Sequence, residues 1–327
     1  MTVMSYIQAI TTALREEMIR DEKVFILGED VGVKGGVFRA TDGLYEEFGA
    51  ERVLDTPLAE SAIAGVGIGA AMYGMRPVAE MQFADFILPA VNQIISEAAK
   101  IRYRSNNDWN VPITIRAPYG GGVHGALYHS QSLESIFANQ PGLKIVMPST
   151  PYDAKGLLKA AIRDNDPVLF FEHKRAYRLL KADVPEEDYV LPIGKADIKR
   201  EGTDITIITY GLCIHFALQA AEKLAEEGID AHIVDLRTVY PLDKEAIIAA
   251  AKKTGKVLLI TEDNKEGSII GEVAAIIAEN CLFDLDAPIM RLAGPDVPAM
   301  PYSPPMEKFF MVNPDKVEKA MRELAEF

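Results

Sequence analysis

The 327-residue chain has two cysteines, one tryptophan and fewer basic than acidic residues. Cys213 and Cys281 are too few for a disulfide framework and too far apart in sequence for a metal-binding motif. No apolar run reaches the ~20 residues that a membrane-spanning helix needs. With 34 basic against 48 acidic residues, the chain lacks the basic excess that binding to nucleic-acid phosphates requires.

What the sequence does contain is typical of a globular protein. It is 49% hydrophobic and 25% charged, which is enough apolar material for sizeable cores. At ~100–200 residues per domain, the length predicts two domains. The net charge of −14 suggests that a protein partner presents a basic surface. The opening segment Ser5–Asp21 is charged, like a surface helix and unlike a signal peptide, so we expect a cytoplasmic protein without membrane or nucleic-acid partners.

Strand-like and helix-like segments alternate along the chain. Most strand-like runs are continuous in Val, Ile, Leu and Phe, a pattern typical of strands buried on both faces. The fold class we predict is therefore α/β, with two domains of mainly parallel sheets. The alternation is interrupted between about Arg175 and Gly202, so we place the domains at 1–185 and 186–327. The helical patterns that matter for the site are Ser61–Tyr73, Phe86–Arg104 and Tyr152–Asp164.

The first segment with chemical potential surrounds Glu60. Gly65-x-Gly67-x-x-Ala70 superficially fits a dinucleotide fingerprint, but that motif needs a strand immediately before its first glycine. The preceding residues look like a loop and a helix start, with Ser61 able to cap the helix. Glu60 is then either a solvated first-turn glutamate or a buried carboxyl group with a raised pKa that holds a proton.

Two further segments follow predicted strands. Gln82 and the aromatics Phe83 and Phe86 suit recognition of a flat heteroaromatic ring, although plain core packing of both aromatics explains them equally well. The glycine-rich segment after the strand ending at Arg116 holds two of the five histidines, His124 and His129. No third metal ligand is evident there, so we favour proton transfer or anion binding by one histidine.

These segments occur in the order found in a known family. The chain resembles the beta subunit of the thiamine-diphosphate-dependent, decarboxylating component of 2-oxo acid dehydrogenase complexes. The resemblance runs over nearly the whole chain and is strongest in Gly28–Gly32 (GEDVG), Asp55–Ser61 (DTPLAES), Gln82–Asp85 (QFAD), His129–Ser132 (HSQS), Asp153–Leu158 (DAKGLL) and Asp235–Thr238 (DLRT). The segment Gly125–Ser132 (GALYHSQS) looks closer to branched-chain than to pyruvate subunits.

The resemblance implies an N-terminal domain that binds the aminopyrimidine half of the cofactor and a C-terminal domain like that of transketolase. Glu60 matches the glutamate that shares a proton with N1′ of the ring, which activates the cofactor. Leu58, Gln82 and Phe86 match residues that line the ring, with Phe86 stacking on it. His129 matches a histidine implicated in substrate handling and acyl transfer, while the role of His124 is left open.

The same resemblance implies partners and ions. Thiamine diphosphate sites use a Gly-Asp-Gly motif for magnesium and diphosphate, and this chain has none. An alpha subunit should therefore hold Mg²⁺ and the diphosphate half in an α2β2 heterotetramer. Asp296 and Phe327 match positions that dock the peripheral subunit-binding domain of the lipoyl acyltransferase core. A structural potassium site is implied at Ile113, Ala161, Ile162, Asp164 and Asp166.

The expected function is that of a 2-oxoisovalerate (branched-chain 2-oxo acid) dehydrogenase beta subunit, which transfers the acyl group to lipoyl-lysine with its alpha subunit. Pyruvate or acetoin as substrate keeps the fold and cofactor and remains an alternative. Two further alternatives are an NAD-dependent Rossmann dehydrogenase that uses Gly65–Ala70 and a docking subunit without chemistry.

Overall fold

The computed structural model describes residues 1–327, which pack as two units. Unit 1 comprises Met1–Tyr119 and Ile136–Ile193, and unit 2 comprises Gly120–Ser135 and Gly194–Phe327. The division is not a single cut of the chain, because Gly120–Ser135 packs with C-terminal residues. No helix is long and apolar enough to cross a membrane.

Unit 1 is built on six parallel strands in the order β6-β7-β5-β4-β2-β3. Strands β2, β5 and β7 are buried at every position. The apolar runs of β2 and of the first four residues of β7 predict this, whereas β5 also buries Thr114 and Arg116. A separate antiparallel pair joins β1 and β8. The strand bounds are β1 Thr2–Ser5, β2 Val24–Gly28, β3 Val53–Asp55, β4 Arg76–Glu80, β5 Thr114–Tyr119, β6 Lys144–Val146, β7 Val168–His173 and β8 Lys181–Val184.

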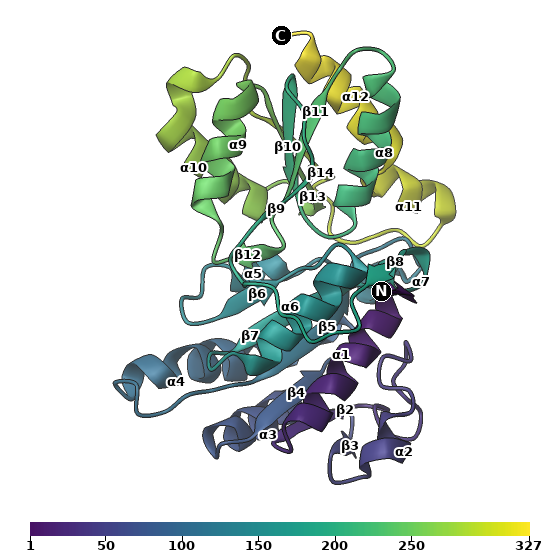
Figure 1. Ribbon diagram of the computed structural model, residues 1–327, viewed down its shortest axis with the longest axis vertical. Helices are drawn as coiled ribbons and strands as arrows, with labels where there is room; N and C mark the ends of the chain where they lie inside the picture. Colours follow the sequence, from purple (N-terminus) through teal and green to yellow (C-terminus); the bar gives the residue numbers. More distant parts are fainter. The chain divides into compact units, whose positions relative to one another are not determined.

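Helices α1 and α6 pack side by side in unit 1 and bury their apolar faces against the sheet (Figure 1). Ser5 and Gln8 form a capping box at the start of α1, and Thr150 caps α6. The predicted helix Phe86–Arg104 is helical throughout but changes type, from a 3₁₀ segment that contains Pro89 to a π segment and then α4. The bounds are α1 Tyr6–Arg20, α2 Leu44–Phe48, α3 Glu60–Met72, a 3₁₀ segment Ala84–Ala90, a π segment Gln93–Ala98, α4 Ala99–Arg104, α6 Pro151–Arg163 and α7 Ala176–Leu179.

Unit 2 has a five-stranded sheet in the order β14-β13-β10-β11-β9, parallel except for the edge strand β9. Helices α8 and α12 pack together over its core, and α9 packs with α10 (Figure 1). The strands are β9 Asp197–Arg200, β10 Ile205–Thr209, β11 Ala231–Asp235, β12 Thr238–Tyr240, β13 Val257–Asn264 and β14 Met290–Gly294. The helices are α8 Cys213–Ala225, α9 Lys244–Thr254, α10 Ile269–Cys281, α11 Pro304–Phe310 and α12 Pro314–Ala325. The short helix α5, Glu134–Phe137, contains the residues at which the chain passes from unit 2 back to unit 1.

The predicted α/β class with mainly parallel sheets is confirmed. Every pairing among the six core strands of unit 1 is parallel, and three of the four pairings in unit 2 are parallel.

Candidate active site

Three neighbouring strands of unit 1 end at the same edge of the sheet. Gly28, at the end of β2, pairs with Asp55 at the end of β3 and with Glu80 at the end of β4. Ligands in open parallel sheets bind outside the carboxyl ends of strands. The segments that follow β2, β3 and β4 therefore meet at one place, and they contain the residues singled out from the sequence.

Glu60 is the first residue of α3 and is only 8% exposed. It is therefore a buried carboxyl group and not a solvated one. The positive end of the helix stabilises negative charge at this position. The expectation that Ser61 caps the helix is wrong: the helix already begins at Glu60, and the capping position is Ala59, which offers no side-chain hydrogen bond.

Glu29 lies in the same region and was not singled out as a site residue from the sequence. It follows β2 directly and is 7% exposed, and its Oε1 atom is buried without a hydrogen-bond partner. Burial, together with the nearby carboxylates of Glu60 and Asp30, raises the pKa of Glu29. A raised pKa favours the protonated form of Glu29. Its position right after a buried strand was the signal that could have found it.

The residues after β4 form the second part of this region. Gln82 Nε2 lies 3.4 Å from Asp30 Oδ2, which ties the end of β4 to the end of β2. Phe86 is half-buried in the 3₁₀ segment, with its ring centroid 5.7 Å from that of Phe83 in an edge-to-face arrangement. Leu58 is 78% exposed in this chain. The 3₁₀ segment that carries Phe86 packs on α3, the helix that begins at Glu60.

The dinucleotide alternative is wrong for this chain. Gly65, Gly67 and Ala70 all lie inside α3, five or more residues after its first residue. A phosphate-binding fingerprint requires the first glycine in the turn between a strand and a helix, where backbone N–H groups are free. Gly67 instead allows close packing, since a Cβ atom there would lie 2.7 Å from Ile113 Cδ1.

The sheet of unit 1 also contains a buried ion-pair network beside these residues. Arg116 is fully buried and donates to both oxygens of Glu172 at 2.6 and 2.7 Å and to Glu80 at 2.5 Å. Tyr177 donates to Glu172 at 2.6 Å. Burial opposes the guanidinium charge, but Glu172 and Glu80 outweigh it and raise the pKa of Arg116. The network fixes the end of β4 from which Gln82 extends.

His129 belongs to unit 2, in the segment Gly120–Ser135, which we call the histidine loop. It is half-buried and follows a 3₁₀ turn at Ala126–Tyr128. His124, in the same loop, is paired with Glu307 through Nδ1 at 2.6 Å. No cluster of three or more His, Cys, Asp or Glu side chains could hold a metal, so neither histidine belongs to such a site.

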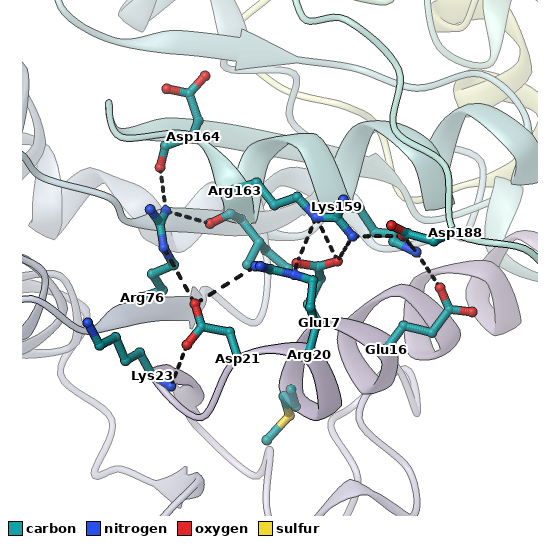
Figure 2. Close-up of polar contacts among 12 residues, drawn as sticks. Glu16, Glu17, Arg20, Asp21, Lys23, Arg76, Lys159, Arg163, Asp164 and Asp188 are labelled. Carbon is teal, nitrogen blue, oxygen red and sulfur yellow. Dashed lines mark hydrogen bonds and ion pairs between the residues drawn. The ribbon is translucent and has the colours of Figure 1, made fainter.

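The backbone oxygens expected to hold potassium have donors within the chain. Arg76 Nη1 donates to the carbonyls of Ile162 at 3.0 Å and Asp164 at 2.9 Å. Figure 2 shows the hydrogen bond between Arg76 and Asp164. The carbonyl of Ile113 accepts from a backbone N–H of β7, and that of Ala161 accepts from the N–H of Asp164. The carbonyls of Ala161, Ile162 and Asp164 lie at the C-terminal end of α6, where a positive charge is favoured.

The carboxylates of the same site are also paired. Lys144 Nζ lies 2.8 and 2.7 Å from the two oxygens of Asp164 and 3.2 Å from Asp166 Oδ2. Arg102 donates to Asp166 at 2.5 Å. Carbonyl and carboxylate oxygens are ligands of hard cations, so their chemistry fits potassium. An ion bound here would share its ligands with Arg76 and Lys144.

The two residues matched to partner docking are accessible on unit 2. Asp296 is exposed in the segment after β14, and Phe327 is 65% exposed at the end of the chain. Docking through them stays a prediction.

Comparisons with known proteins identify both domains and the family of the chain. The family model "Transketolase, pyrimidine binding domain" matches residues 2–179, and "Transketolase, C-terminal domain" matches residues 194–317. The chain is 83% identical, over all of both chains, to the 2-oxoisovalerate dehydrogenase subunit beta of Bacillus subtilis. It is 51% identical, again over all of both chains, to the pyruvate dehydrogenase E1 component subunit beta of the same organism.

Solved structures share the fold at low identity. A split-gene transketolase, described as an inactive beta4 tetramer, superposes with a TM-score of 0.80 at 22% identity, covering 99% of this chain and 98% of that one. The family expected from the sequence is confirmed: with both domain models matched and 83% identity over the full length, the chain belongs to the family of thiamine-dependent 2-oxo acid dehydrogenase E1 beta subunits.

Proposed function

We propose that the chain is the beta subunit of a branched-chain 2-oxo acid dehydrogenase that, with an alpha subunit, decarboxylates 2-oxoisovalerate and transfers the acyl group to lipoyl-lysine. The observation that carries the proposal is the 83% full-length identity to a 2-oxoisovalerate dehydrogenase subunit beta, against 51% to a pyruvate dehydrogenase beta subunit. The buried carboxyl groups Glu60 and Glu29 support the chemistry.

The residues present fit the aminopyrimidine half of thiamine diphosphate. Glu29 has a buried carboxyl oxygen without a partner, and Glu60 is buried beside it. Nitrogen groups of such a ring supply the hydrogen bonds that buried carboxyl groups need. Gln82 offers an amide, and Phe86 offers an aromatic face for stacking. Leu58, exposed in this chain, would lose its exposure against the ring.

Glu60 then controls a proton. Its carboxyl group shares a proton with N1′ of the bound aminopyrimidine, and the raised pKa of Glu29 provides a second proton-holding group nearby. Thiamine diphosphate, when bound, supplies the nucleophile and the electron sink for decarboxylation. His129 acts later, by orienting the lipoyl group and exchanging a proton with it during acyl transfer.

The chain lacks a motif for the magnesium and diphosphate half of the cofactor site, and we infer the partner subunit from this. The chain has no Gly-Asp-Gly motif, so we assign Mg²⁺ and the diphosphate to the alpha subunit of an α2β2 heterotetramer. We assign Asp296 and Phe327 to docking of the lipoyl acyltransferase core. Because the chain carries a net charge of −14, this docking should weaken as salt concentration rises.

Glu60→Gln tests the proton role. In the heterotetramer reconstituted with the alpha subunit, this variant should fold and bind cofactor but lose exchange of the cofactor's C2 proton. Glu46→Gln makes the same chemical change at an exposed glutamate of α2 and serves as the matched control. Exchange at the wild-type rate in Glu60→Gln would remove Glu60 from the mechanism.

The substrate and the role of His129 need separate measurements. The kcat/KM for 2-oxoisovalerate should exceed that for pyruvate, and the reverse order would favour the pyruvate alternative. His129→Ala should lose more lipoyl acylation than reduction of an artificial electron acceptor, because the second assay bypasses acyl transfer. Equal losses would place His129 outside the transfer step.

A further inference from the structure

The histidine loop is fastened to the rest of unit 2 by two buried carboxylates from distant parts of the sequence. Glu262, in β13, accepts a hydrogen bond from the backbone N–H of Gly121 at 2.5 Å. Glu307, in α11, accepts from the N–H groups of Gly122 and His124, both at 3.1 Å. Both carboxylates are less than 9% exposed.

Glu307 makes the larger contribution to this fastening. Besides the two backbone bonds on Oε1, its Oε2 atom lies 2.6 Å from Nδ1 of His124. The Glu307 side chain is 5% exposed, so water competes little for its oxygens. Hydrogen bonds to an ionised acceptor are about twice as strong as neutral ones. One side chain therefore holds two residues of the loop at three donor atoms.

The fastened residue also has a backbone conformation that needs support. His124 has a φ of +57°, in the left-handed region that non-glycine residues seldom adopt. The bonds from its backbone and side chain to Glu307 hold it there. Without them, the loop would relax toward ordinary backbone angles.

The position of His124 determines that of His129. Gly125 follows His124 directly, and a Cβ atom at Gly125 would lie 2.8 Å from the Cβ of His129 and 2.7 Å from its carbonyl oxygen. The turn Ala126–Tyr128 thus folds back so that His129 packs on the residue next to the anchor. A shift of His124 therefore displaces His129, because Gly125 and His129 are packed without free space between them.

We propose that Glu307 is a positioning residue for His129: it fixes the histidine loop through Gly122 and His124, and so sets the imidazole of His129 for acyl transfer. This inference rests on the proposed function of His129. It assigns Glu307 no contact with substrate or cofactor.

The first measurement is independent of activity. Leu127 and Tyr128 are exposed and are chymotrypsin sites, so cleavage there reports release of the loop in the full chain. Glu307→Ala should raise the cleavage rate about tenfold, the change expected from losing hydrogen bonds to a charged acceptor. Glu307→Gln should restore slow cleavage, because the amide oxygen accepts the same two N–H bonds. Lys308→Ala changes the exposed neighbour on α11 and serves as the control.

The second measurement uses the heterotetramer. Glu307→Ala should lower the kcat for lipoyl acylation about tenfold while the KM for 2-oxoisovalerate stays within about twofold, and Glu307→Gln should recover most of the kcat. His124→Ala removes only a 57%-exposed imidazole and should give a smaller change in the same direction even if Glu307→Ala does not fold.

The results separate this inference from the function on which it rests. Wild-type cleavage in both Glu307→Ala and His124→Ala would overturn the anchoring. Faster cleavage with unchanged acylation would overturn the positioning role, and if His129→Ala also acylates normally, the function proposed for His129 fails with it.

Discussion

Glu134 should carry a proton at neutral pH, and this can be tested by its effect on stability. Its side chain, at the end of the histidine loop, is 1% exposed. Tyr210 donates to Oε1 at 2.8 Å, and Oε2 is buried without a partner. Burial, followed by the nearby Asp263 carboxylate, raises the pKa of Glu134 to about 8 against the opposing effect of Tyr210. A protonated carboxyl group is therefore the form that this site favours.

The size of the effect follows from proton counting. In the unfolded chain this glutamate titrates near 4.5, so between pH 4.5 and about 8 the folded chain binds one more proton than the unfolded chain. The contribution of Glu134 to stability is then fully present below pH 4.5 and is lost as pH rises through about 8. The free energy of unfolding should fall by up to about 1.4 kcal/mol per pH unit across this window.

Glu134→Gln isolates this contribution. The amide is neutral at every pH, and its oxygen still accepts the hydrogen bond from Tyr210. The free energy of unfolding, measured by urea titration with circular dichroism at several pH values, should fall with pH less steeply in the variant than in the wild type. Infrared spectra of the wild type at pH 7 should contain the C=O band of protonated carboxyl groups, and this band should be weaker in the variant.

The control is Glu279→Gln on the exposed side of α10, which should leave the pH dependence unchanged. If the curves of wild type and Glu134→Gln run parallel from pH 5 to about 8, Glu134 is already ionised in the folded chain. The burial argument would then be refuted.

Three further predictions concern unit 1. Arg116→Met leaves the buried Glu172 carboxylate without its cation and should lower the free energy of unfolding by about 3–5 kcal/mol in urea titration; a loss below about 1 kcal/mol would contradict the network's importance. Gly142→Ala should destabilise more than Gly43→Ala by thermal melting: both glycines have positive φ, but a Cβ at Gly142 would lie 2.0 Å from the carbonyl of Ala99, and one at Gly43 meets nothing within 4 Å. If potassium binds at the end of α6, KCl should raise the melting temperature above that in choline chloride at equal ionic strength, and identical melting temperatures would remove the site.

Local pattern was sufficient for the central strands of both sheets but not for the edge strands β3 and β9. Continuous apolar runs mark β2 and the start of β7, because strands covered on both faces have no solvent-facing side chains to alternate with apolar ones. Polar residues that follow parallel strands gather at one edge of the sheet, which is why the sequence marks Gln82 as a candidate, while the roles of Gln82 and Glu60 stay predictions.

The errors of detail arise where tertiary packing overrides local signals. Ser61 is a good capping residue, yet α3 begins one residue earlier, at Glu60. The helical pattern Phe86–Arg104 is helical throughout, but the pattern does not reveal that its first part is 3₁₀ and its middle part is π. The glycines of α3 imitate a phosphate-binding motif, but Gly67 is small because Ile113 packs on the helix there.

The histidine loop shows what a sequence pattern does not contain. The glycines and histidines of this loop predict a functional segment. Nothing in the sequence around Glu262 or Glu307 indicates that these two residues anchor the loop. Glu262 lies 141 residues along the chain from Gly121, and Glu307 lies 185 residues from Gly122, the residues whose N–H groups donate to them. Because a carboxylate needs no special neighbours in sequence to accept a backbone N–H, such anchors have no motif, and only the folded chain brings them to the loop. The residues that hold a catalytic side chain in position are therefore harder to predict than the side chain itself.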